Sequence, residues 1–510
     1  MTARPGPVTA QVRDVEGFRD LVARRLGLLF EDAKLGFLGD VLRRRLESGA
    51  EDVPTYLARL EKAPTAEEIG FLAQALTVPE TYFFRNIDQF HALARAALPE
   101  RIRARRTQRT LRLLSAGCAS GDEAFSMAIA VREYLPHASS DVSIRGVDLN
   151  PVVLQRAEQA RFTEWALRET PEQLRRKWFQ PEGREFILEA SLRGAVEFEQ
   201  RNLSLDDPQL WPGDHYDVIF CRNVIMYFTP ESAHALIARM TRALAPGGYL
   251  FLGHAETLRG LSQDFHLQHT HGTFYYQRKD GAQIATAHPG GIESRRDSSA
   301  SSLTTIVDDA GSWVDAIQRA AHRIQVLARS AAAGPAATLT PRPRWDLGSA
   351  LDLLRRERFS DALDAVYALP PESVRDPDVL MLEAVLLTHS GQLEQARGAC
   401  QRLLAVDELN AGAHYILALC LEAEGDRRGA ADHDQIAVYL DPTFAMPRLH
   451  LGLLARRAAD RAKARRELNQ ALLLLQREDA SRLLLFGGGF GRETLIALCS
   501  AELGNCADRA

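Results

Sequence analysis

Residues 111–130, LRLLSAGCASGDEAFSMAIA, constrain the fold of this chain more than any other stretch. An apolar run typical of a buried strand leads into a loop with Gly117 and Gly121, and apolar residues at helical spacing follow the loop. Four further β-rich runs, separated by helical stretches, lie at residues 141–150, 195–203, 215–225 and 247–256. This alternation predicts an α/β domain with a mostly parallel sheet that is covered by helices on both faces.

The rest of the chain divides by composition. Residues 12–97 carry apolar residues at helical spacing, as in FRDLVARRLGLLF at 18–30, which predicts an all-α N-terminal domain. The α/β domain is then expected at residues 98–278. Residues 279–344 contain runs rich in Ser, Ala, Gly and Pro, and this composition is typical of a flexible linker.

An internal period of 34 residues marks the C-terminal part of the chain, residues 345–510. Ala396 recurs as Ala430 and again as Ala464, and a stretch that begins at Ser349 is a plausible first copy. A 34-residue period with small residues at helix contacts is the signature of tetratricopeptide repeats, in which paired helices stack into a solenoid. The alternative is a set of unrelated helical hairpins.

Composition and charge exclude several classes of function. A net charge of −5 argues against general nucleic-acid binding. Apolar runs stay well short of the ~18–20 residues of a membrane span, and the N-terminus lacks the apolar core of a secretory signal. The six cysteines form no C-x-x-C pair, which disfavours a structural zinc site or a disulfide framework. We therefore expect a cytoplasmic protein without a metal site.

The loop after the first β-rich run predicts a nucleotide-like ligand. Free N–H groups at the start of a helix attract ligands, and Gly117 and Gly121 would let the backbone approach one closely. Asp148 ends the next β-rich run, where doubly wound folds place an acid against ribose hydroxyls. Because Asn150 and Pro151 follow, Asp148 is also suited to cap the next helix, and both roles are compatible.

Two ligand classes fit this loop: a dinucleotide such as NAD, and S-adenosylmethionine. The spacing G-x-x-x-G departs from the dinucleotide fingerprint G-x-G-x-x-G. Asp122 and Glu123 would repel a pyrophosphate but suit a ligand with an ammonium and a sulfonium group. Charge therefore favours S-adenosylmethionine, although Glu123 would also stabilise the start of a helix.

Six stretches give the chain a resemblance to chemoreceptor glutamate methyltransferases, the CheR family. They occur in the family's order: TYFFRN (81–86), SAGCASGDEAFS (115–126), VDLN (147–150), RNL (201–203), YDVIFCRNVIMYF (216–228) and LAPGGYLFLGHAETL (244–258). The resemblance spans Val15–Arg278, and the 34-residue repeats resemble those of tetratricopeptide-bearing members. The chain departs from the family pattern at Asn86, where Glu is usual, and reads ASGDEAFS for STGEEPYS and GHAE for GHSE.

The resemblance implies a Rossmann-like class I methyltransferase domain between the helical domain and the repeat solenoid. A small antiparallel subdomain is expected at about residues 169–200. Arg85 would hold the acceptor carboxylate and Tyr227 would order the transferred methyl group, although an ion pair for Arg85 and a core position for Tyr227 are the structural alternatives. With Gly117, the residues expected to bind S-adenosylmethionine and its product S-adenosylhomocysteine are Thr81, Arg85, Glu123, Asp148, Asn202, Leu203, Arg222 and Asn223.

The implied substrate is the cytoplasmic helical bundle of a chemotaxis receptor, methylated on glutamate side chains. Arg43, Arg44 and Arg45 would form a basic face that docks its acidic helices, or else belong to a solvated helix with one structural arginine. The repeats are expected to bind a protein partner. Alternatives are transfer to another acidic protein, transfer to nucleic acid or a small molecule, and a regulatory scaffold with an idle methyltransferase. The N–P–P–Y type motif of amino-group methyltransferases is absent where CRNV stands, which disfavours nucleic acid.

Overall fold

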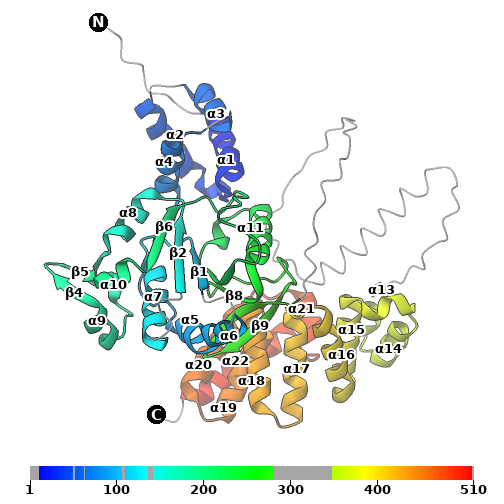
Figure 1. The fold of residues 1–510 in the computed structure, drawn as a ribbon. Helices are drawn as coiled ribbons and strands as arrows, with labels where there is room; N and C mark the ends of the chain where they lie inside the picture. Colours follow the sequence, from blue (N-terminus) through cyan, green and yellow to red (C-terminus); the bar gives the residue numbers. More distant parts are fainter. Residues whose placement is uncertain are drawn as a thin grey trace, which may run out of the picture. The chain divides into compact units, whose positions relative to one another are not determined.

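The computed structural model describes residues 11–49, 52–62, 64–105, 110–135, 142–280 and 347–507. The chain forms two compact units, Met1–Ala285 and Thr286–Ala510 (Figure 1). The predicted linker at 279–344 lies almost entirely outside the described residues, and the predicted domain limits stay predictions. Among the helices that the structure describes, none is long and apolar enough to cross a membrane.

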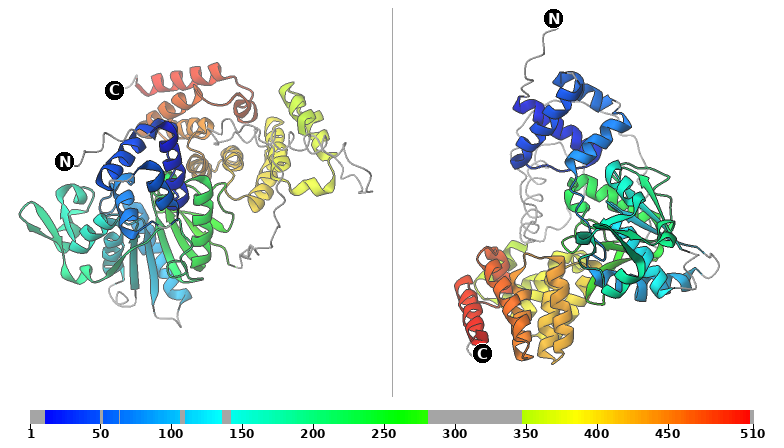
Figure 2. Two further views of the ribbon diagram at one scale, coloured as in Figure 1. Left: turned by 90° about the horizontal axis from the view of Figure 1, so that it is seen from above. Right: turned by 90° about the vertical axis from the view of Figure 1, so that its left-hand side faces the viewer.

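Four helices form the front of the first unit, and Figures 1 and 2 show them beyond one end of the strands of the sheet. They are α1 (Val12–Leu26), α2 (Leu35–Gly49), α3 (Val53–Lys62) and α4 (Ala66–Leu76), with a 3-10 turn η1 (Asp32–Lys34) before α2. Phe18, Leu42 and Tyr56 lie in their shared apolar core. A single helix over 18–30 was expected, but α1 ends at Leu26 because Gly27 adopts a left-handed φ of 74°.

A buried ion pair ties α2 to α4. Glu68 is fully buried, and its carboxylate accepts hydrogen bonds from the guanidinium of Arg45 at 2.6–2.9 Å and from the hydroxyl of Tyr56 at 2.9 Å. The Arg45 guanidinium also lies 4.9 Å from the centre of the Phe71 ring. Arg45 is therefore a structural arginine, whereas Arg43 and Arg44 are exposed.

A seven-stranded sheet forms the centre of the first unit. Its strands are β1 (Leu111–Ala116), β2 (Val142–Asp148), β6 (Val196–Gln200), β7 (Tyr216–Cys221), β8 (Leu244–Leu252), β9 (Phe265–Thr270) and β10 (Thr273–Arg278). The order is β6-β2-β1-β7-β8-β10-β9, and only the pairings of β10 within this sheet are antiparallel. The predicted α/β fold class is thus confirmed. The chain switches direction across the sheet between β1 and β7, and ligands of such sheets bind at the carboxyl ends of the strands at this switch point.

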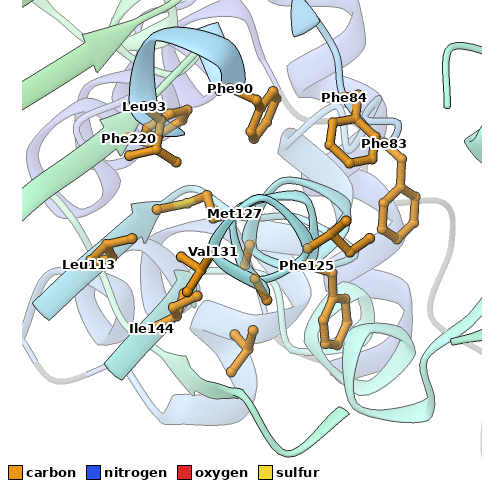
Figure 3. Close-up of a cluster of buried hydrophobic side chains, with 14 of the residues drawn as sticks. Phe83, Phe84, Phe90, Leu93, Leu113, Phe125, Met127, Val131, Ile144 and Phe220 are labelled. Atoms are coloured by element: carbon orange, nitrogen blue, oxygen red, sulfur yellow. The ribbon is translucent and has the colours of Figure 1, made fainter. Parts of the chain in front are cut away.

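Helices and a small sheet cover the central sheet. The helical segments are α5 (Ile87–Ala92), the π-helix η2 (Leu93–Ala97), α6 (Leu98–Ala104), α7 (Asp122–Tyr134), α8 (Pro151–Gln159), η4 (Glu164–Leu167), α9 (Glu172–Trp178), α10 (Ala190–Arg193), η5 (Ile225–Tyr227) and α11 (Pro230–Ala243). The small antiparallel sheet has the order β3-β5-β4, with β3 (Arg161–Thr163), β4 (Phe179–Glu182) and β5 (Glu185–Leu188). Met127 and Val131 of α7 pack with Ile144 and Phe220 of the strands and Phe90 of α5 in one buried cluster (Figure 3).

The second unit consists of paired helices. Its helical segments are α13 (Leu347–Arg355), α14 (Phe359–Tyr367), η7 (Pro371–Arg375), α15 (Pro377–His389), α16 (Leu393–Val406), α17 (Ala411–Ala423), α18 (Arg427–Leu440), α19 (Ala445–Arg457), α20 (Arg461–Leu475), α21 (Ala480–Phe486) and α22 (Arg492–Ala507). Helices α15, α17 and α19 begin 34 residues apart, as do α14, α16, α18 and α20. Ala362, Ala396, Ala430 and Ala464, also 34 residues apart, are fully buried. The predicted period is thus present, and its layout fits tetratricopeptide repeats.

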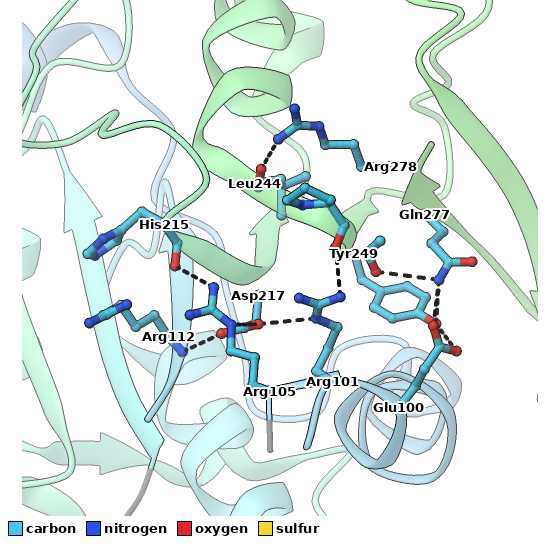
Figure 4. A network of polar contacts seen from close by, with 12 residues as sticks. Glu100, Arg101, Arg105, Arg112, His215, Asp217, Leu244, Tyr249, Gln277 and Arg278 are labelled. Carbon is cyan, nitrogen blue, oxygen red and sulfur yellow. Dashed lines mark hydrogen bonds and ion pairs between the residues drawn. The ribbon is translucent and has the colours of Figure 1, made fainter. Parts of the chain in front are cut away.

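A buried carboxylate fastens the opposite end of the sheet from the strand ends at the switch point (Figure 4). Asp217, fully buried at the start of β7, accepts hydrogen bonds from Arg101 of α6 at 3.1 Å, from Arg105 at 2.6 Å and from the N–H of Arg112 at 3.0 Å. The second guanidinium nitrogen of Arg101 donates to the carbonyl of Pro246 at 2.8 Å. This network joins α6 to three neighbouring strand starts.

We predict that Asp217→Ala lowers the free energy of unfolding of the first unit by about 3–5 kcal/mol, because it leaves two buried guanidinium groups without their carboxylate. Urea unfolding followed by tryptophan fluorescence measures this change. The control is Asp206→Ala, which removes an exposed ion pair with Arg242 and should cost less than about 1 kcal/mol. Equal effects of the two substitutions would show that the buried network does not stabilise the sheet.

Candidate active site

A cavity of about 720 Å³ lies where the front helices meet the carboxyl ends of β1, β2 and β7. Its volume is in the range of small-molecule sites. It is lined by the ten residues that the sequence predicted: Thr81, Arg85, Gly117, Glu123, Asp148, Asn202, Leu203, Arg222, Asn223 and Tyr227. The structure therefore brings all ten together, and their individual roles stay predictions.

The loop after β1 is shaped by its two glycines. Gly117 lines the cavity with a φ of 81°, and a Cβ there would lie 2.5 Å from Cγ2 of Val224. The N–H groups of Gly117 and Cys118 donate to the carbonyl of Val147 at 2.8 and 3.0 Å, so the loop is tied to β2. Gly121 lies outside the cavity lining and serves close packing, since a Cβ there would lie 2.9 Å from the Ala157 Cβ.

Glu123, in the first turn of α7, is held between a hydroxyl and a cation. Ser115 donates to Oε1 at 2.7 Å, and the guanidinium of Arg222 lies 3.3 Å from Oε2. Burial raises the pKa of Glu123, while the charge of Arg222 opposes this shift. Arg222 is itself buried, donates to the carbonyl of Arg85, and has an Nε atom without a hydrogen-bond partner among the described residues.

Asp148 joins the loops that follow β1 and β2. One carboxylate oxygen accepts from the N–H of Ala119 at 2.9 Å and the other from the N–H of Asn150 at 2.8 Å. Burial raises the pKa of Asp148, and these N–H groups oppose the shift. The cap of α8 is Asn150, whose side chain accepts from the N–H of Val152, so Asp148 does not take the capping role that its sequence position also allowed.

The front helices close the cavity through a short backbone pairing. Leu28 forms an antiparallel bridge with Phe228, and the N–H of Leu29 donates to the carbonyl of Tyr227 at 2.8 Å. The side-chain amide of Asn202 donates to the carbonyl of Arg25, the penultimate residue of α1, at 2.9 Å. Asn202 therefore links the sheet to the front helices from a position on the cavity wall.

Arg85 lies half-buried on the cavity wall, after Phe83 and Phe84 of the sheet's core. Its guanidinium donates to the carbonyl of Glu80 at 3.2 Å and lies 5.6 Å from the Tyr82 ring centre. Within the described part of the chain Arg85 forms no ion pair. The alternative that Arg85 serves a structural ion pair is therefore not found. Asn86, the departure from the family pattern, adopts a left-handed φ of 59°, which Asn tolerates better than most residues.

Sequence reasoning missed Glu256, which supports the cavity wall by binding the backbone of the turn after β7. Its buried carboxylate accepts four backbone N–H groups, from Asn223, Val224, Met226 and Gly253, at 2.7–3.3 Å. These bonds hold the turn after β7, where Asn223 has a left-handed φ of 57°. The only signal in the sequence is the position of Glu256 in GHAE, directly after a buried strand.

The cavity opening carries exposed apolar side chains that the sequence did not single out as a group. Their exposed fractions are 49% for Leu29, 40% for Phe37, 68% for Val78, 55% for Met226 and 43% for Tyr227. All five line the cavity, and they come from both the front helices and the turn after β7. We call them the apolar rim. Exposed apolar residues gathered around one cavity are typical of an interaction surface.

Known proteins are similar to this chain in sequence. The family model described as "CheR methyltransferase, SAM binding domain" matches residues 79–274. Chemotaxis protein methyltransferase 2 of Vibrio cholerae is 32% identical over 269 residues, which is 52% of this chain and 92% of that protein. The probable biofilm formation methyltransferase WspC of Pseudomonas putida is 29% identical over 451 residues, 88% of this chain and 96% of that protein.

The fold, the cavity and these matches together define a methyltransferase that uses S-adenosylmethionine. The chain belongs to the CheR family of chemotaxis protein methyltransferases. Its residues fit this donor, because two half-buried carboxylates, Glu123 and Asp148, line a cavity of suitable size and suit a ligand with positive groups.

We predict that Glu256→Gln weakens binding of S-adenosylhomocysteine roughly 10- to 100-fold, because the amide loses acceptor capacity for N–H groups and costs about 1.5–3 kcal/mol. Isothermal titration calorimetry measures the dissociation constant. Glu231→Gln, on the exposed first turn of α11, is the matched control and should bind like the wild type. An unchanged affinity of the Glu256 variant would show that the turn holds its shape without this carboxylate.

Proposed function

We propose that the chain transfers a methyl group from S-adenosylmethionine to glutamate side-chain carboxylates of methyl-accepting chemotaxis receptors. The observation that carries this proposal is the position of Arg85. A half-buried cation without an acidic partner among the described residues stands in the same cavity as the two acids that suit the donor. It is available to an incoming carboxylate.

The proposed methyl transfer requires no general acid or base. The bound donor supplies a methyl group activated by its sulfonium. A glutamate side chain is ionised at pH 7, with an ordinary pKa of about 4.3, so the acceptor needs no base. Arg85 would hold one carboxylate oxygen and direct the other towards the methyl group, and Tyr227 would cover the reacting atoms against water. Positioning of this kind supplies up to about 7–11 kcal/mol of a reaction barrier.

The surface around the cavity supports a helical substrate. Phe37 of the apolar rim and Arg44 are both exposed and stand seven residues apart on α2, which places them on one face of the helix. This face leads away from the cavity opening. A receptor helix with apolar and acidic residues would find complementary groups along it. Arg43 is exposed beside it and paired with Asp40 at 2.6 Å, whereas Arg45 is withdrawn into its bond with Glu68.

The repeats of the second unit would bring the enzyme to a protein partner. Stacked helix pairs of this kind form extended concave surfaces that suit protein binding. The alignment with WspC of Pseudomonas putida, which extends over 88% of this chain, supports a working combination of methyltransferase and repeats in one protein.

The test is methyl transfer from labelled S-adenosylmethionine to a receptor cytoplasmic fragment. We expect label that mild base releases as methanol, because glutamate methyl esters hydrolyse under these conditions. Label that resists base would overturn glutamate as the acceptor. Donor binding without any transfer would favour a regulatory scaffold.

We predict that Arg85→Ala lowers the transfer rate roughly 100-fold or more, since the acceptor carboxylate loses its positioning cation. Initial rates at saturating donor measure this loss, and calorimetry of the same protein with S-adenosylhomocysteine tests whether donor binding survives. Arg95→Ala is the matched control, because Arg95 is exposed on the π-helix η2, ten residues after Arg85, and lies outside the cavity lining. Wild-type rates for the Arg85 variant would remove the basis for the proposal.

A further inference from the structure

Helix α21 breaks the regular pattern of the second unit. The helices α15, α17 and α19 each have 13 residues and begin at 377, 411 and 445, so the next is expected to begin at 479. Helix α21 begins at Ala480 but ends after seven residues at Phe486. A regular member of the stack would pack on the neighbouring pair alone. Instead, α21 contacts α15 and α17, and its Phe486 packs on Phe444 directly before α19.

The apolar contacts of α21 centre on Phe486. Its ring lies 5.0 Å from that of Phe444 and 6.0 Å from that of Tyr415, both edge-on. Gly412 of α17 makes room for it, since a Cβ there would lie 2.8 Å from the Phe486 ring and from Cε of Met381. Phe486 is only 4% exposed and is therefore seated in a pocket made by three successive helix pairs.

Polar groups of the same face hold both ends of α21. Arg482 is paired with Asp441 at 2.7 Å, and Glu478 accepts the N–H of Ala445 at 2.7 Å. At the other end, the carbonyl of Leu485 is 3.2 Å from Nε2 of His389. Side chains of the repeats thus satisfy backbone and charged groups of α21, as a receptor does for a bound peptide.

The surroundings of α21 suit a helix that can leave its place. A pocket of about 190 Å³ that is open to solvent lies beside α21, lined among others by Val385, Ile416 and Leu485. The segment after α21 reads GGGFG, residues 487–491, with left-handed φ values of 61° at Gly488 and 82° at Gly489.

Most contacts of helix α22 lie outside α21. It packs on α20, and its Glu502 is paired with Arg456 of α19. Its first residue, Arg492, donates to the carbonyl of Glu478, two residues before α21. The glycine-rich segment therefore connects the short helix α21 to the long helix α22. Release of α21 would leave the paired helices up to α20 and their contact with α22 in place.

We propose that the face formed by α15, α17 and α19 is a binding groove for a helical segment of a partner protein, and that α21 is its internal occupant. Arg482 and Phe486 are four residues apart and lie on one face of α21. The partner segment is thus a helix with a basic residue four positions before an aromatic one. The partner helix binds only after α21 has left the groove. Because α21 competes for the same groove, it lowers the apparent affinity for the partner helix.

The probe that tests this is a fluorescent synthetic peptide of residues 476–490, titrated into the full chain and followed by fluorescence anisotropy. We expect the double variant Arg482→Ala/Phe486→Ala, whose own helix has lost both anchors, to bind this peptide roughly tenfold or more tightly than the wild type does. A peptide with the same two substitutions should not bind. The control variant is Phe490→Ala, since Phe490 is 57% exposed, and it should behave like the wild type.

Equal binding to wild type and double variant, or no binding to a folded double variant, would overturn the proposal. Circular dichroism with an unchanged helical signal establishes that the variant is folded. If the double variant does not fold, amide hydrogen exchange of the wild type tests whether α21 leaves the groove. The amides of α21 should exchange faster than those of α17 and α19, and exchange at the same slow rate would make α21 a fixed part of the stack and contradict its release.

Discussion

A short pairing between the front helices and the sheet creates the cavity on which the rest of the first unit's chemistry depends. The N–H groups of Leu29 and Thr229 donate to the carbonyls of Tyr227 and Gly27, each at 2.8 Å. This is possible only because Gly27 turns the chain out of α1 with a left-handed φ, in a place where a Cβ would lie 2.9 Å from the Phe228 ring. Without this pairing, the carboxyl ends of the strands would form an open ledge rather than a cavity.

The cavity wall carries both acidic and basic side chains. The carboxylates of Glu123 and Asp148 lie at the loops after β1 and β2, and the field of Arg222 is largely directed at Glu123. Arg85 lines the same cavity and forms no ion pair among the described residues, and its charge also opposes the rise of the Glu123 pKa. Acids beside a positively charged donor and a cation beside a negatively charged acceptor make an arrangement that suits transfer between the two. The same arrangement disfavours a phosphate-bearing cofactor.

The sequence predicted those features of the fold that depend on short stretches of chain. The strand–loop–helix at 111–130 and the acids beside its glycines lie within one short stretch, and the 34-residue period repeats one local pattern. The structure has the α/β sheet and the buried alanines that they imply. What the sequence did not reveal depends on pairing between distant segments. Glu256 matters because it reaches the turn at 223–226, the chain after α1 pairs with residues 227–229, and α21 contacts α15, which lies about a hundred residues earlier in the chain.

The central claim is that the loops after β1 and β2 hold the methyl donor, and Asp148 tests it most directly. Calorimetric titration of the full chain with S-adenosylmethionine should show a dissociation constant roughly tenfold or more higher for Asp148→Ala than for the wild type, in protein whose near-ultraviolet circular dichroism is unchanged. An unchanged dissociation constant in such a folded variant would contradict the claim, because it would place the donor away from these loops.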